Sequence, residues 1–167
     1  MRRTIVILAL LVSTLIAGCG TDEKVGSKEE VVINQDQLMS ANPVLYESDA
    51  IGVQVLEAPG WSLTKSTNES ATFQNESVLA LVTIVSKNNS VAEIKKDLIS
   101  NAGSSAIIEE DDYFISWQSK RNESIQTEIF IEEGDSHYVL VTFMTPTHLR
   151  ENIELSIKDF KNSLKIN

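Results

Sequence analysis

The sequence predicts an α+β fold, and three observations indicate it. Two stretches, 78–85 and 138–143, are apolar at nearly every position and rich in β-branched residues. Strands of this kind are buried on both faces, so other elements must cover each side of their sheet. Two amphipathic helical patterns, within residues 90–102 and 145–164, can supply that cover.

The folded domain is expected to begin near Leu45 or Ile51. From Ile51 to Leu56 apolar residues recur at every second position, which is the period of a strand with one buried face. Pro59-Gly60 ends this strand, because proline and glycine favour a turn over a ladder. A short second strand is predicted over residues 71–74.

A helix is predicted after the apolar strand at 78–85. Ser90 and Glu93 have the spacing of a capping box, in which each side chain binds the backbone N–H of the other. Ile94 and Leu98 then follow at helical spacing, and Gly103 is a typical residue just past a helix end. The helix is therefore expected to lie between Ser90 and Gly103.

Strands are predicted to follow this helix. Two candidates are 106–108 and 113–117, and a hairpin is predicted over 125–143 because apolar residues alternate up to the turn at 132–136. The chain then returns as the second apolar strand. A sheet built from these neighbours would be largely antiparallel.

The last predicted element is a helix. Thr145 can cap it, and Pro146 suits its first position because the proline N–H would have no partner there. One apolar stripe runs along it at spacings of three and four. The stripe consists of Leu149, Ile153, Ile157, Phe160 and Leu164.

The order of these parts resembles the PsbP-like superfamily, over about residues 45–166. The resemblance depends mainly on Pro59-Gly60-Trp61 after an alternating strand and on the terminal helix ending near residues 160–164. It implies an αβα sandwich, a central antiparallel sheet with helices on both faces. It implies no common enzyme activity, and the photosynthetic and nuclear roles of known members do not carry over. No metal ligand of those members matches His137 or His148.

Residues 1–18 have the three parts of a secretory signal peptide. Arg2-Arg3 forms the positive start, Ile5 to Val12 begins an apolar core, and Ala17-Gly18 supplies small residues before a cleavage point. The apolar run is too short to span a bilayer and is followed by a polar tail. The chain is therefore expected to be exported.

The end of this segment resembles the lipobox of bacterial lipoproteins. Ile16 stands at the aliphatic position, Ala17 and Gly18 at the small positions, and Cys19 at the required thiol. The resemblance implies cleavage between Gly18 and Cys19 and a diacylglycerol on the cysteine sulfur. The alternative is an ordinary signal peptide with a chance cysteine. Because Cys19 is the single cysteine of the chain, no disulfide is expected in either case.

Three regions are predicted: the signal peptide at 1–18, a lipidated cysteine and tether at 19–48, and a globular domain at 49–167. The formal net charge is −10, and loss of the two signal-peptide arginines makes the mature charge −12. Such an acidic chain is a poor nucleic-acid binder and is repelled by anionic lipid headgroups. The anchor, rather than the surface of the domain, is thus expected to hold it on the extracytoplasmic face of the cell membrane.

Few residues of the domain indicate chemistry. Trp61 and Trp117 are candidates for lining a ligand groove, with packing in the core as the alternative. The acidic runs 109–112 and 132–135 are candidate cation sites, with solvated loops as the alternative, because adjacent side chains of an extended segment point to opposite faces. No cofactor, no metal site and no catalytic residue are predicted.

The sequence thus favours a non-catalytic binding or accessory module for an unknown envelope protein. The second hypothesis is a small-ligand or lipid-binding protein that uses a cleft between sheet and helix. An enzyme is the third, and it has the least support because no nucleophile motif such as GxSxG is present. The oligomeric state is left open.

Overall fold

The computed structural model describes residues 43–120 and 124–167. The predicted signal peptide, the cleavage site at Gly18 and Cys19, and the tether as far as residue 42 lie outside the described residues. Within the described ranges, no helix has the length and apolar character that crossing a membrane requires.

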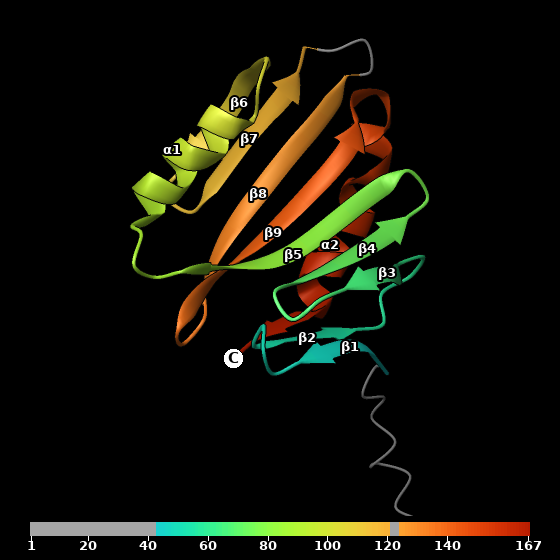
Figure 1. Ribbon diagram of the computed structural model, residues 1–167. Helices are drawn as coiled ribbons and strands as arrows, with labels where there is room; N and C mark the ends of the chain where they lie inside the picture. The colour runs from blue at the N-terminus through green and yellow to red at the C-terminus, as the bar shows by residue number, and fades with distance from the viewer. Residues whose placement is uncertain (1–42, 121–123) are drawn as a thin grey trace, which may run out of the picture. The chain divides into compact units, whose positions relative to one another are not determined.

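A seven-stranded antiparallel sheet forms the centre of the domain, in the order β3-β4-β5-β9-β8-β7-β6 (Figure 1). The two central pairs, β5 with β9 and β8 with β9, continue in register over eight and nine residues. The strands are β3 (Ser62–Ser66), β4 (Ser70–Asn75), β5 (Val78–Ser86), β6 (Ser105–Asp111), β7 (Phe114–Ser119), β8 (Ile125–Glu133) and β9 (His137–Pro146).

A second, three-stranded antiparallel sheet contains β1 (Val44–Ser48), β2 (Val53–Leu56) and β10 (Leu164–Ile166). The sequence assigned residues up to 48 to the tether, but β1 pairs with β2, and Leu45 and Tyr46 pack against the core. Residues 44–48 therefore belong to the folded domain, because a strand is stable once its backbone pairs and one side is covered.

The helices cover opposite faces of the large sheet. Along β9, Val141 and Phe143 belong to the core cluster that contains Phe160 of α2 (Glu154–Ser163). Leu140 belongs instead to the cluster that contains Ile94 of α1 (Val91–Asn101). Because successive side chains of a strand point to opposite faces, α1 and α2 lie on different sides of β9, as Figure 1 shows.

Aromatic rings close α2 onto the sheet. Phe160 is fully buried, and its ring centroid lies 4.5 Å from Trp61, 5.1 Å from Phe73 and 5.7 Å from Phe143. Rings at these separations add edge-to-face contacts to their large buried area. One side chain of α2 thereby connects the large sheet with the β2–β3 loop.

The predicted capping box of α1 is present. The Ser90 side chain accepts from the backbone N–H of Glu93 at 3.3 Å, and Glu93 Oε2 accepts from the backbone N–H of Ser90 at 2.8 Å. The Ser90 hydroxyl also donates to Glu93 Oε2 at 2.8 Å, and the hydrogen bonds that this carboxylate accepts, first from the backbone and then from the side chain of Ser90, lower the pKa of Glu93. The helix ends at Asn101, and Gly103 follows with a positive φ of 67°.

The prediction of an α+β fold with an antiparallel sheet and two helices is confirmed, with local differences. Strand β3 was not predicted, because all five residues are exposed and show no alternation. Thr145 does not cap the last helix but lies buried in β9, where it pairs with Gln126. The chain continues as a 3-10 helix, η2 (Thr147–Ile153), before α2 begins.

The aromatic cluster predicts an unequal response to truncation along α2. We expect Phe160→Ala to cost about 3–5 kcal/mol of unfolding free energy, since it removes a buried ring and leaves a cavity. The matched change Leu155→Ala, at a side chain that is 69% exposed on the same helix, should cost less than about 0.5 kcal/mol. Urea unfolding measures both, and equal costs would contradict the packing described.

The capping box predicts a pH-dependent contribution to stability. The folded state lowers the pKa of Glu93 below the ordinary value of 4.5, so the ionised carboxylate stabilises the fold. That contribution is fully present above pH 4.5 and is lost as the pH falls through the lowered value. Glu93→Gln cannot titrate, so its deficit in unfolding free energy should be larger at pH 6 than at pH 3. A deficit that is independent of pH would contradict the role of the carboxylate.

Candidate functional site

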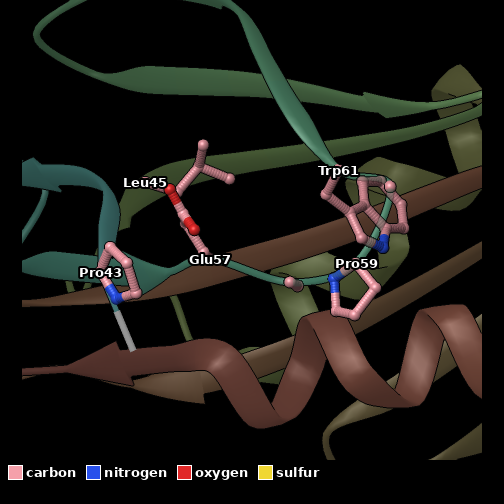
Figure 2. A pocket seen from close by; sticks show the side chains of 7 residues that line it. Pro43, Leu45, Glu57, Pro59 and Trp61 are labelled. Atoms are coloured by element: carbon pink, nitrogen blue, oxygen red, sulfur yellow. The ribbon is translucent and has the colours of Figure 1, made fainter. Parts of the chain in front are cut away.

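Trp61 lies where the chain leaves the small sheet and enters the large one. Its side chain is almost fully buried and lines the inner wall of a pocket of about 390 Å³. Figure 2 shows Pro43 at one end of this pocket and Pro59 and Trp61 at the other, with the side chains of Leu45 and Glu57 between them. The described chain thus begins at the rim of this pocket.

Hydrogen bonds hold Trp61 in place. Its indole N–H donates to Ser156 of α2, at 3.0 Å to the hydroxyl and 3.2 Å to the carbonyl oxygen. The Asn75 amide donates to the same hydroxyl at 2.8 Å and to the Pro59 carbonyl at 3.2 Å. This network couples the β2–β3 loop to α2 and β4, so Trp61 serves the core as well as the pocket wall.

Gly60 permits this arrangement. It has a positive φ of 78°, and a Cβ built on it would lie 2.8 Å from Asn75 Nδ2. A side chain at this position would therefore strain the backbone and displace a hydrogen-bonded amide.

The structure does not bring Trp61 and Trp117 together. Trp117 is half-buried on β7 and packs against the cluster beneath α1, whereas Trp61 belongs to the cluster beneath α2. The two tryptophans therefore face opposite sides of the large sheet and do not line one groove.

The two acidic runs meet at a groove that the sequence did not predict. Asp111 is the last residue of β6 and Asp112 lies in the β6–β7 turn, whereas Glu132 and Glu133 are at the end of β8. In register, Asp111 pairs with Phe114 and Phe114 with Phe130, so these residues form one row across three strands. The groove has a volume of about 730 Å³ and contains both phenylalanines among its lining residues.

Hydrogen bonding and burial shift the pKa values of two side chains at the groove. The Tyr113 hydroxyl donates to Glu133 Oε1 at 2.9 Å, and this carboxylate raises the pKa of Tyr113, so the donor stays protonated. Lys161 of α2 places its ammonium 3.3 Å from the centroid of the Phe130 ring. Burial lowers the pKa of Lys161, while Glu132 and Glu128 act in the opposite direction.

Neither histidine lies in a candidate catalytic or metal site among the described residues. Nε2 of His137 donates to the Ile51 carbonyl at 2.7 Å, and Nδ1 lies 3.0 Å from the Ser136 hydroxyl. His148 is exposed in η2. Across residues 43–120 and 124–167, no group of three or more His, Cys, Asp or Glu side chains is placed to hold a metal ion.

A partly buried ion pair fastens η2 to the sheet. Arg150 donates to Glu128 Oε1 at 2.8 Å, and Glu128 lies on β8 with a side chain that is 8% exposed. Removing one partner of such a pair would leave a charge in a poorly hydrated place. The pair therefore holds the segment that leads into α2.

No protein-family model and no curated protein matches the sequence. Solved structures do show similarity. A mutant of the protein Mog1 aligns at 9% identity with a TM-score of 0.51, and the alignment covers 76% of this chain and 96% of that one. Cyanobacterial PsbP from Synechocystis aligns at 10% identity over 73% and 91% of the chains, with a TM-score of 0.46.

A protein from Bacteroides thetaiotaomicron aligns at 12% identity and a TM-score of 0.45 over 73% of this chain. The alignment spans 47% of that protein, about half its length. At these identities the similarity concerns the fold alone. The similarity to the Mog1 structure shows that this chain has a Mog1-like α+β fold.

The close approach at Gly60 predicts a graded response to alanine. Gly103→Ala should cost about 1 kcal/mol, because its φ is positive but no atom lies within 4 Å of the added carbon. Gly60→Ala has the same backbone strain and must also displace the Asn75 amide, so we expect about 1 kcal/mol more per hydrogen bond lost. Thermal unfolding compares the two, and equal losses would argue against the Asn75 contact.

Proposed function

We propose that this chain is a lipoprotein anchored through Cys19 to the extracytoplasmic face of the cell membrane. Its domain acts as a non-catalytic binding or accessory module for an envelope protein. The observation that carries the proposal is Ile16-Ala17-Gly18-Cys19, with the single cysteine of the chain at the position that lipidation requires. Two acyl chains, at about 0.8 kcal/mol per buried methylene, hold a protein stably on a bilayer.

The length of chain after the cysteine limits where the domain can act. Pro43, the first described residue, is 24 residues from Cys19. A chain of that length spans at most roughly 80 Å when fully extended. Pro43 of an anchored domain would therefore lie within that distance of the bilayer, and the partner would be sought among membrane and envelope proteins.

The packing of the domain favours a surface partner over an internal ligand. The space between the large sheet and α2 is filled by the rings of Trp61, Phe73, Phe143 and Phe160. A cleft in that place would have supported the alternative of a small-ligand or lipid-binding protein. The larger concave feature lies instead at the sheet margin, in the groove with Phe114 and Phe130.

The anchor is tested by Cys19→Ser in the full chain. Without the thiol there is no acceptor for the lipid, so we expect loss of labelled fatty-acid incorporation and stalled processing or release from the membrane fraction. Thr21→Ser, just beyond the lipobox, is the matched control and should behave as the unmodified chain. A Cys19→Ser chain that is still cleaved and still sediments with membranes would overturn the proposal.

A further inference from the structure

The groove bordered by the two acidic runs lies on the α2 side of the large sheet, beyond the part that α2 covers. Phe130 packs against the core cluster beneath α2, and its ring lies 6.1 Å from Phe143. Phe114 continues the same row toward the sheet margin, with 4.7 Å between the centroids of Phe114 and Phe130. The groove thus has an aromatic floor that the core holds from one side.

This floor already binds a cation. The Lys161 ammonium lies 3.3 Å from the centroid of Phe130, which is the geometry of a cation–π contact. Burial lowers the pKa of Lys161, so the ammonium is partly withdrawn from water at this position. The ring surface therefore accepts the ammonium of a lysine in the structure itself.

The rim supplies opposite charge. Asp111, Asp112, Glu132 and Glu133 all line the groove and are exposed. Among the described residues the ion pairs join Lys95 to Glu110 and Arg150 to Glu128, so none of the four rim carboxylates is in an ion pair. Within the domain, Glu132 interacts with the charge of Lys161, and Glu133 accepts a hydrogen bond from Tyr113. An occupant with positive charge is complementary to the four rim carboxylates, and on the floor it would contact Phe114 or compete with Lys161 for Phe130.

The neighbouring edge indicates a protein segment as the occupant. Strand β6 is the last strand of the large sheet, so along the described chain one side of its backbone has no strand partner. Ile107 and Ile108 on β6 are 49% and 52% exposed. An extended segment can pair with such an edge and cover such side chains. A second copy of this chain would oppose Glu109, Glu110 and Asp111 with like charges.

We propose that the groove and β6 bind an extended segment of a partner protein that carries a lysine or arginine. The cation of that residue lies on the Phe114–Phe130 floor between the rim carboxylates, and the segment continues along β6. This inference names the class of partner for the proposed binding module. The binding itself does not depend on the anchor, so it is tested separately from Cys19.

The probe is an acetylated, amidated peptide of alternating lysine and valine, with a glutamate–valine peptide as its counterpart. Binding to the purified full chain is measured by fluorescence anisotropy. Asp111→Asn with Glu132→Gln should weaken binding of the lysine peptide by about fivefold or more. Asp49→Asn with Glu69→Gln removes the same charge at exposed sites outside the groove and should leave binding within about twofold.

Two further variants test the floor. Phe114→Leu keeps an apolar side chain but removes a ring, so binding should weaken by about two- to fivefold. Lys161→Gln removes the ammonium that already contacts Phe130 and would compete with the peptide. Binding of the peptide should therefore tighten by a similar factor. General misfolding would not produce tighter binding.

Equal weakening by both carboxylate pairs would show attraction by net charge alone and would overturn the site. Spermidine displacing the peptide at an equal concentration of positive charge would overturn the assignment of a protein segment. If the lysine peptide binds but the chain is never found attached to membranes, this site is supported and the proposed anchor is contradicted. Attachment through Cys19 without peptide binding would do the reverse.

Discussion

The burial of β9 on both faces is the constraint on which the rest of the domain depends. Val141 and Phe143 require cover on one side and Leu140 on the other, so the sheet is stable only when both helices are in place. The two helices are recruited differently. The capping box fixes α1 locally at its start, whereas α2 is held by tertiary contacts through Phe160, Ser156 and the ion pair that secures η2.

Much of this architecture could be predicted from the sequence, because several signals are local. The apolar strands, the capping box from Ser90 to Glu93 and the hairpin around residues 132–136 depend on nearest neighbours. The predictions that were wrong or missing have one cause, which is that tertiary strand pairing outweighed the local preference of the sequence. Thr145 and Pro146 suit a helix start in isolation, but the ladder with β8 extends β9 through both. Strand β3 has no pattern of its own and is held by its pairing with β4.

The candidate site was less predictable for a related reason. Tryptophan is a conspicuous residue, yet the side of the sheet on which Trp61 or Trp117 lies depends on strand register and not on composition. The groove assembles residues from the end of β6, the β6–β7 turn, the start of β7 and the end of β8, and the Lys161 ammonium reaches its floor from α2. The sequence around Asp111 and around Glu132 does not indicate that these two side chains line the same groove. The alternation along residues 125–131 does place Phe130 on one face of its strand. Its pairing with Phe114 would have been the available signal for an aromatic surface at this place.

The small sheet has a mechanical consequence. It joins the first described strand to the last, since β1 and β10 both pair with β2, and the Asn167 N–H donates to the Gly52 carbonyl at 2.9 Å. A pull on the chain at Pro43 reaches β1 first, and β1 passes the load both to β2 through its ladder and to the aromatic core through the contact of Tyr46 with Phe73. The ladder between β1 and β2 therefore takes part of the load that reaches the domain at Pro43. Because β1 is an edge strand, force on it would first break its ladder with β2 and its core contacts, and not the ladders of the seven-stranded sheet.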